Sequence, residues 1–208
     1  MELDQIRTLA GQLAARFGIQ PPPVESGKVP KWSLDGLWAR RRKGQPVLLV
    51  GSAFNNYLSP AEQEGALAAA VVSLDLVKTR RRKFLITSYF SLLAVGMILV
   101  FAGGLFRRTH NIDVPSWLLP ALIGGGFAIS YYMTIAVWLR RIIYHTDRRV
   151  AELMGRPVID MLLNIDNRGQ PQPRILVAAF LMIVVPSKTQ RIKRLDMLEP
   201  QTESSIAR

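Results

Sequence analysis

The chain has two histidines, and imidazole is the side chain that most often acts as a base or a metal ligand near neutral pH. They are His110 and His145, which the predicted topology places on opposite sides of a bilayer, and His145 lies two residues from Asp147. With a serine such as Ser52 or Ser73, these two residues would supply the groups of a hydrolytic triad. Neither a G-x-S-x-G elbow nor an S-x-x-K motif accompanies them. A histidine two residues from an aspartate on a basic helix is more typical of a solvated surface.

Cysteine is absent, which excludes disulfides, thiolate catalysis and cysteine-ligated zinc. The chain combines a hydrophobic content of 49% with a formal net charge of +12, a pairing that is unusual for a soluble globular protein. Its basic clusters border long apolar runs. This pattern is typical of a membrane protein and less of a nucleic-acid-binding protein, so we expect no nucleic-acid partner.

Two charge-free runs, Phe84 to Phe106 and Pro115 to Leu139, predict a transmembrane hairpin. Each is long enough to cross a hydrocarbon core of roughly 30 Å as a helix, and the short segment between them makes the two spans antiparallel. Basic residues border both outer ends, so we expect these ends on the cytoplasmic side, in contact with lipid headgroups. The residues expected to face headgroups are Arg80, Arg81, Arg82, Lys83, Arg140 and Arg141.

A helix is predicted to begin at Ser59. Ser59 is a good N-cap, Pro60 suits the first helical position, and Glu62 completes an S-x-x-E capping box. Apolar residues then recur at helical spacing as far as Val77. Taken alone, the small residues near Ala70 predict a helix face that packs closely against another element.

The stretch from Tyr57 to Asp75 resembles the active-site helix of the HtpX-like membrane zinc metalloproteases, in which a similar start leads into an H-E-x-x-H motif. Aligned with that motif, Ala69 and Ser73 occupy the positions of the two histidines, and Ala70 occupies that of the glutamate. Zinc enzymes of this type use the two imidazoles as ligands and the carboxylate to activate water. Methyl groups can do neither, and a serine hydroxyl is a poor zinc ligand beside imidazole or thiolate.

Two later segments extend the resemblance. Ile143, Tyr144, Asp147 and the run 153–155 resemble the second signature helix of the family, with Ile143 in place of the third zinc-ligating residue. The segment from Val185 to Leu195 resembles a closing element in which Val185 replaces a histidine. The resemblance therefore implies a relative that has lost its metal ligands, with no bound metal and no cofactor.

The fold implied is mainly α with a small β-sheet, a zincin-like soluble domain interrupted by the two-helix hairpin. Residues 1–83 and 140–208 would form the two parts of that domain, and residues 84–139 the hairpin. An edge strand is expected beside the helix that begins at Ser59, formed by the apolar run from Pro46 to Val50. The residues of the implied partner groove are Val47, Leu48, Leu49, Val50, Ala69, Ser73, Ile143 and Asp147.

Local patterns predict the remaining elements. We expect an amphipathic helix from Glu2 to Gly18, an extended course after the prolines at 21–23, and a helix from Val158 to Ile165. The basic run at 40–43 is expected to be a solvated turn or a contact with lipid headgroups. The apolar run 175–185 is short for a span and predicts a buried helix or strand, with a re-entrant segment as the alternative, and residues 199–208 predict a mobile tail.

Three functions remain open on the sequence. The first is a catalytically inactive, membrane-anchored relative that binds a protein or peptide by strand addition, in the plasma membrane of a bacterium with its soluble part in the cytoplasm. The second is an active membrane-bound peptidase with non-standard machinery, and the third is a basic adaptor at an anionic membrane surface. The identity of a partner and the oligomeric state stay open.

Overall fold

The computed structural model describes residues 1–30, 33, 35–42, 45–110, 118–165 and 183–197. These residues are mainly helical and include one three-stranded sheet. They form two compact units, which are described separately below. One unit combines the described residues of 1–79 with those of 140–208, and the other is Arg80–Leu139.

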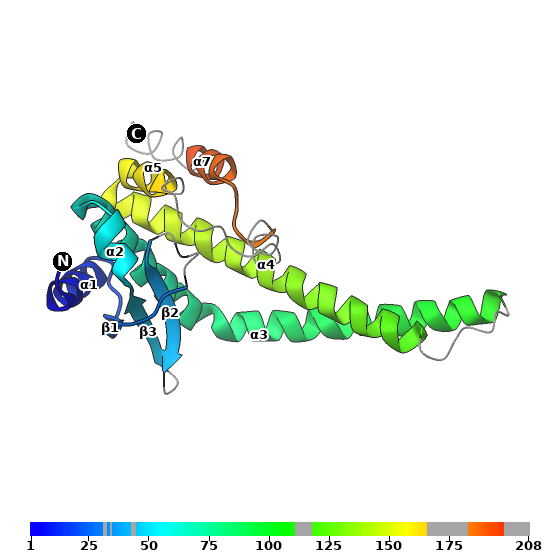
Figure 1. The fold of residues 1–208 in the computed structure, drawn as a ribbon. Coiled ribbons are helices and arrows are strands. Elements are labelled where there is room, and N and C mark those ends of the chain that lie inside the picture. The colour runs from blue at the N-terminus through cyan, green and yellow to red at the C-terminus, as the bar shows by residue number, and fades with distance from the viewer. Residues whose placement is uncertain (31–32, 34, 43–44, 111–117, 166–182, 198–208) are drawn as a thin grey trace. The chain divides into compact units, whose positions relative to one another are not determined.

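The first unit contains the sheet. Its strands are β1 (Val24–Ser26), β2 (Leu37–Arg42) and β3 (Gln45–Val50), in the spatial order β1-β3-β2 (Figure 1). β1 runs parallel to β3, whereas β2 runs antiparallel to it, with Ala39 opposite Leu48. β3 is thus the middle strand, and all four residues from Val47 to Val50 are buried.

Two expectations about this sheet were wrong. The run Pro46 to Val50 is not an edge strand, because a strand with neighbours on both sides and four consecutive buried residues is an interior strand. Arg40–Arg42 is not a turn but the end of β2, which is one of the two edge strands. Exposed arginines such as Arg40 are compatible with an edge strand, since charged side chains there discourage pairing with other molecules.

Helices cover the sheet and complete the core of this unit. α1 (Leu3–Arg16) lies beside β1 and buries Ile6, Ala10, Leu13 and Ala14. α2 (Ser52–Tyr57) follows β3. The first unit also contains the short helices α5 (Arg156–Leu163) and α7 (Lys188–Asp196). The predicted helices at 2–18 and 158–165 therefore exist, with α1 slightly shorter and α5 starting two residues earlier.

Two long helices extend beyond the predicted segments. α3 (Pro60–His110) contains both the helix predicted from Ser59 and the first predicted span, without a break. α4 (Leu118–Met154) likewise joins the second predicted span to the segment around Asp147. Residues 60–79 of α3 and 140–154 of α4 belong to the first unit, where Leu67, Val71 and Val150 are fully buried.

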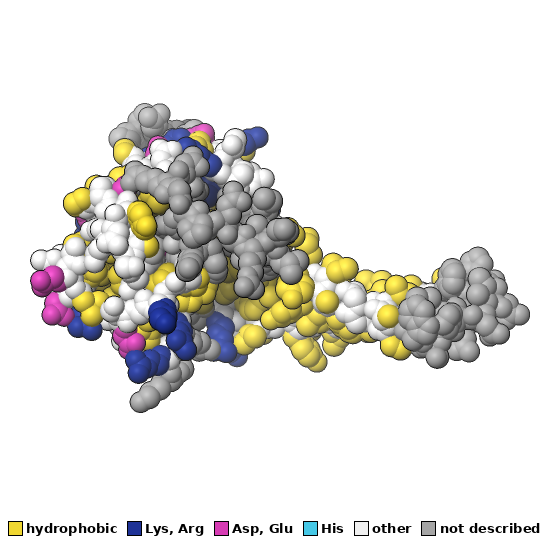
Figure 2. All heavy atoms as spheres, in the orientation of Figure 1, with side chains coloured by type: hydrophobic (Ala, Val, Ile, Leu, Met, Phe, Trp, Pro, Cys, Tyr) yellow, Lys and Arg dark blue, Asp and Glu magenta, His cyan; other side chains and the backbone are white. Residues whose placement is uncertain are grey.

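The second unit is a helical hairpin made of residues 80–110 of α3 and 118–139 of α4. Ser91 Oγ lies 3.1 Å from Ser130 Oγ, and the rings of Phe84 and Trp138 lie 4.5 Å apart between centroids. Large apolar side chains such as Met97, Phe101 and Ile129 are nevertheless exposed. Figure 2 shows hydrophobic side chains along the hairpin on the face drawn. By length and composition, both helices could cross a membrane.

Several predictions fall outside the described residues. The apolar run 175–185 is described only from residue 183, and the predicted tail at 199–208 is not described. Of the segment between the two predicted spans, residues 107–110 are the end of α3, and residues 111–114 are not described.

Candidate functional site

A cleft of about 240 Å³ lies in the first unit, between the β2 edge of the sheet and three helices. The segment before β2, together with β2 and β3, contributes Asp35, Leu37, Trp38, Ala39 and Leu48. The helices contribute Ala69, Ala70 and Ser73 from α3, Ile142, Ile143, Thr146 and Asp147 from α4, and Arg191 from α7. Most of these side chains are apolar, so the cleft is a largely hydrocarbon surface with few polar groups.

The cleft unites residues that the sequence places far apart. Ala69 and Ser73, one helical turn apart on α3, share it with Ile143 on α4. These are the positions that the resemblance assigns to metal ligands. Asp147 lies one turn further along the same face of α4, because residues four apart on a helix are neighbours.

Only one of the four predicted β3 residues lines the cleft. Leu48 does so, and its partner Ala39 lies beside it on the same face of the sheet. Val47 and Leu49 point to the opposite face, because side chains alternate along a strand. Val50 shares the face of Leu48 but pairs with Leu37 at the end of the strand and does not line the cleft.

An ion pair forms one wall of the cleft. Arg191 donates two hydrogen bonds to Asp147, from Nε to Oδ2 at 2.7 Å and from Nη2 to Oδ1 at 2.5 Å. The side chain of Asp147 is only 4% exposed and that of Arg191 is 20% exposed. This two-pronged geometry is the strongest form of arginine–carboxylate contact. Both acceptor oxygens of Asp147 are therefore already in use.

The other polar groups of the cleft differ in how they are satisfied. Ser73 Oγ donates to the backbone oxygen of Ala70 at 2.9 Å, within its own helix. Asp35 Oδ1 accepts from the backbone N–H of Leu37 and shares the single hydroxyl hydrogen of Ser33 with the backbone oxygen of Leu37. Thr146 is 6% exposed, and its Oγ1 has no hydrogen-bond partner among the described residues. The hydroxyl of Thr146 is therefore enclosed by protein and is not an accessible group of the cleft.

The backbone of β2 is open at its outer edge over a short stretch. Leu48 donates to Pro23 and Val50 accepts from Gly27, so these two residues of β3 direct their backbone groups towards β1. The alternate residues of β3 consequently bond to Trp38 and Arg40, which leaves Leu37, Ala39 and Arg41 facing outwards.

The outward groups of Leu37 are already occupied. Its backbone oxygen accepts from Ser33 Oγ at 2.7 Å, and its N–H donates to Asp35 Oδ1 at 3.1 Å. Gly36, just before the strand, has a φ of +65°, and a Cβ there would meet the backbone N of Phe54 at 2.3 Å, so only glycine fits this turn. Within the described residues, the unpaired edge therefore consists of Ala39 and Arg41.

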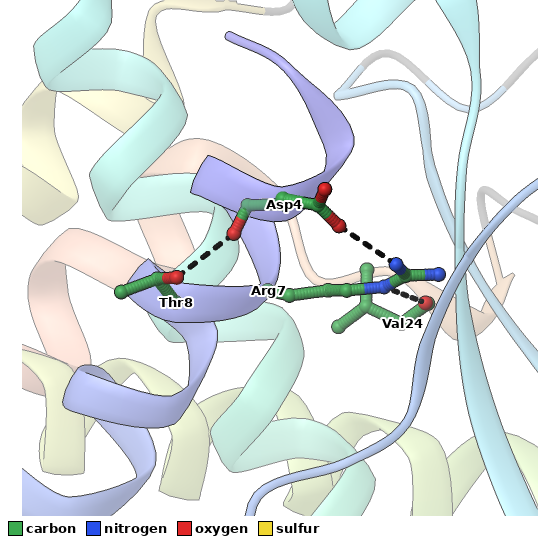
Figure 3. Close-up of polar contacts among 4 residues, drawn as sticks. All are labelled: Asp4, Arg7, Thr8 and Val24. Atoms are coloured by element: carbon green, nitrogen blue, oxygen red, sulfur yellow. Dashed lines mark hydrogen bonds and ion pairs between the residues drawn. The ribbon is translucent and has the colours of Figure 1, made fainter.

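The opposite edge of the sheet, β1, is partly covered by α1. Arg7 Nε donates to the backbone oxygen of Val24, at 3.1 Å, and Arg7 Nη1 contacts Asp4 Oδ1 at 2.8 Å (Figure 3). In β1 the outward residues are Val24 and Ser26, because Pro23 and Gly27 bond to β3, and Arg7 bonds the carbonyl of Val24. A side chain that caps an edge carbonyl and a helix beside the strand both discourage pairing with another chain. The two edges thus differ, and only the β2 edge adjoins the cleft.

The groups considered for a hydrolytic triad are not brought together. Asp147 is buried and bonded to Arg191, whereas His145 is exposed and does not line the cleft. Residues two apart on a helix lie on different faces. Ser52 is exposed on α2, and the hydroxyl of Ser73 donates within its own helix. Among the described residues, no three histidine, aspartate or glutamate side chains are grouped so that they could hold a metal ion.

The basic residues expected at lipid headgroups are mostly accessible. Arg81, Arg82 and Lys83 on α3 and Arg141 on α4 are exposed, and Arg80 and Arg140 are half-buried.

The sequence did not identify three of the groups that shape the cleft. Arg191, Thr146 and the β2 residues owe their roles to long-range packing, and the one local signal was the position of Thr146 beside Asp147.

Comparisons with protein-family models, with curated proteins and with solved structures found no match.

Proposed function

We propose that this chain is a catalytically inactive, membrane-anchored protein that binds an extended segment of a protein partner by adding it to the β2 edge of the sheet. The observation that carries the proposal is the unpaired backbone of Ala39 and Arg41 next to the cleft. Strand addition derives its affinity from main-chain hydrogen bonds and its specificity from pockets for alternate side chains.

The asymmetry of the sheet supports this proposal. At β1, α1 lies beside the strand and Arg7 bonds the outward carbonyl of Val24, and both features discourage pairing there. On β2, the side chains of Ser33 and Asp35 bond to the outward backbone groups of Leu37 but not to those of Ala39 or Arg41. The remaining opening offers the N–H and C=O of Ala39 and those of Arg41, enough to fix the register of a short extended segment.

The chemistry of the cleft supports an inactive relative of a zincin-like, HtpX-like metalloprotease. The positions that the resemblance assigns to metal ligands, Ala69, Ser73 and Ile143, line one cleft. Their side chains supply two hydrocarbon groups and one hydroxyl, a set that does not hold zinc in competition with water. Among the described residues that line the cleft there is no histidine, and the two carboxylates, Asp35 and Asp147, already accept hydrogen bonds.

The hairpin supports membrane anchoring. Its exposed side chains include Phe90, Met97 and Phe101, and a soluble protein would bury such a surface. The exposed cations at 81–83 and at Arg141 border the apolar parts of α3 and α4. By the positive-inside bias, they favour a cytoplasmic soluble unit in a bacterial inner membrane.

The test is a proline substitution at the open edge. Ala39→Pro removes an outward N–H without removing a bond to β3, and proline is tolerated on edge strands in this position. Purified full-length protein in nanodiscs would be screened against a library of extended peptides by fluorescence anisotropy. We expect Ala39→Pro to abolish binding and Ala39→Ser, which keeps the N–H, to retain it.

Two results would overturn the proposal. One is a peptide that binds equally well to the Ala39→Pro variant, since strand addition at β2 would then play no part. The other is a stoichiometric, tightly held zinc ion in metal analysis of the purified protein, together with peptide hydrolysis that a chelator abolishes.

A further inference from the structure

The β2 edge determines which residues of an added strand would face which residues of this chain. Its open backbone groups are those of Ala39 and Arg41, so an added segment would form its hydrogen bonds there. In an antiparallel pair of strands, residues that exchange hydrogen bonds alternate with residues that do not. Arg40, between the two open residues, would therefore face one residue of the segment in a non-hydrogen-bonded pair. In such pairs the Cα atoms are only about 4.5 Å apart and the side chains are closest.

The side chain of Arg40 carries a charge that no residue in the described part of the chain neutralises. It is exposed and makes no ion pair with any described residue. By contrast, Arg42 is paired with Glu25 of β1 at 2.8 Å. Because side chains alternate along a strand, Arg40 and Arg42 share the face of β2 opposite to that of Ala39. An added strand would therefore meet one unneutralised positive charge next to the open backbone of Ala39.

The charge of Arg40 limits which segments can pair with β2. A like charge directly opposite is destabilising in a sheet, whereas an opposite charge stabilises the pair. An arginine at an open edge therefore discourages most strands but favours those that have a carboxylate at the residue opposite. The formal net charge of +12 acts in the same sense, because it raises the local concentration of acidic partners.

A second copy of this chain does not fit the same edge. If two β2 strands paired antiparallel through both open residues, Ala39 of each would face Arg41 of the other. The two Arg40 side chains would then lie directly opposite each other, and like charges in this position are destabilising. The edge therefore favours a different, acidic partner over self-association.

We propose that the partner segment is acidic, with a glutamate or aspartate at the residue opposite Arg40. The residues on either side of it would pair with Ala39 and Arg41, and their side chains would lie on the face of Ala39. The residue opposite Ala39 would adjoin the cleft, where Leu48 and Ile143 supply hydrocarbon, so an apolar side chain suits this place. The recognised pattern is thus an acidic residue next to an apolar one in an extended segment. This inference rests on the proposed strand addition at β2.

The experiment measures three peptides against the full-length protein in nanodiscs of phosphatidylcholine, a lipid without net charge. The peptides are Thr-Val-Xaa-Val-Thr-amide with an uncharged fluorophore at the amino end, and Xaa is glutamate, glutamine or lysine. Their sequence is the same on both sides of Xaa, so Xaa faces Arg40 in either strand direction. By fluorescence anisotropy we expect the glutamate peptide to bind about threefold more tightly than the glutamine peptide. It should bind about tenfold more tightly than the lysine peptide, since attraction is then replaced by repulsion.

Substitutions at Arg40 test whether this residue causes the preference. Arg40→Gln should abolish the difference between the glutamate and glutamine peptides, and Arg40→Glu should reverse the order, so that the lysine peptide binds best. The matched control is Arg148→Gln, which makes the same change of side chain and of net charge at an exposed position on α4. It should leave the ratios of the affinities unchanged. Raising the salt concentration from about 0.1 M to about 1 M should reduce these ratios on the unmodified protein, because exposed charges are then screened.

The outcomes separate this inference from the proposed function. If the three peptides bind equally, or if Arg40→Gln keeps the preference for glutamate as Arg148→Gln does, selection by Arg40 is refuted while strand addition stands. If none of the three binds while other peptides of the wider library do, acidic residues among those peptides support the inference and their absence refutes it. If no peptide of the library binds, or if binding persists in Ala39→Pro, the proposed function itself is refuted.

Discussion

Asp147 on α4 and Arg191 on α7 form a two-pronged ion pair at the wall of the cleft, with N–O distances of 2.7 and 2.5 Å. Other contacts also hold α7 in the first unit. Asp196, at its end, pairs with Arg156 at the start of α5, and Lys188, at its start, donates to Asn164 Oδ1. Because the carboxylate of Asp147 is almost fully buried, the pair fixes α7 more than a surface contact would.

Replacing Arg191 with methionine should be strongly destabilising. The variant leaves the carboxylate of Asp147 buried without its cation, and breaking a buried pair in this way costs about 3 kcal/mol. For a chain of this size, that loss corresponds to a fall in Tm of roughly 6–12 °C. Thermal unfolding of the detergent-purified protein, followed by circular dichroism, would measure it.

The matched control is Arg148→Met. Arg148 pairs with Glu152 one turn away on α4, and both side chains are more than half exposed. Such pairs contribute between 0 and about 1 kcal/mol. Equal shifts in Tm for the two variants would show that the pair between Arg191 and Asp147 stabilises the protein no more than the exposed pair does.

The start of α3 gives a second prediction. Glu62 Oε2 accepts from the backbone N–H of Ser59 at 2.8 Å, and Ser59 Oγ accepts from the N–H of Glu62 at 3.4 Å, which is the reciprocal capping box expected from the sequence. Ser59→Ala should lower the free energy of unfolding by about 1 kcal/mol, since a helix N-cap is lost. Ser52→Ala should change it little, because Ser52 is exposed and the N-cap of α2 is Gly51. Chemical denaturation would compare the two, and an equal effect would contradict the role of the cap.

That capping box illustrates what the sequence could predict. Ser59, Pro60 and Glu62 act over a single turn, so their pattern determines a helix start whatever surrounds it. The hairpin could be predicted for a similar reason, because a long charge-free run identifies a candidate span by composition alone. Both signals are local.

The pairing of β1 with β3 and the polar groups of the cleft depend on contacts between distant parts of the chain. β2 and β3 are close in the sequence, with Arg42 opposite Gln45, but a run of basic residues is not a typical strand pattern and was interpreted as a turn. Similarly, the hydroxyl of Thr146 is buried without a hydrogen-bond partner among the described residues because of how the chain folds around it. Strand register and burial arise from tertiary packing, which single-sequence patterns do not encode.

The serines of the hairpin give a third prediction. Ser91 Oγ and Ser130 Oγ lie 3.1 Å apart, and the chain has no cysteine. The double variant Ser91→Cys, Ser130→Cys should therefore form an intramolecular disulfide on mild oxidation in membranes, because only a small shift separates the two sulfur atoms. Loss of thiol labelling by a maleimide–polyethylene glycol reagent would report it on a gel.

The control pairs Ser91→Cys with Ile129→Cys. Ile129 is exposed on α4, one residue away from Ser130. Its side chain should point away from α3, so this pair should keep both thiols reactive. Equal rates of oxidation for the two pairs would contradict the packing of the hairpin.

The glycines of α4 give the last prediction, which uses the same disulfide as a readout. A Cβ at Gly126 would come within 2.5 Å of Leu99 Cδ1 on α3, whereas one at Gly124 would meet nothing within 4 Å. Gly126→Leu should therefore force the two helices apart, at a cost of about 1–3 kcal/mol, and slow the oxidation of the cysteine pair at positions 91 and 130 several-fold. Gly124→Leu adds the same side chain on an open face and should leave the rate unchanged. If both variants slow the reaction equally, the close approach at Gly126 is not what holds α3 and α4 together.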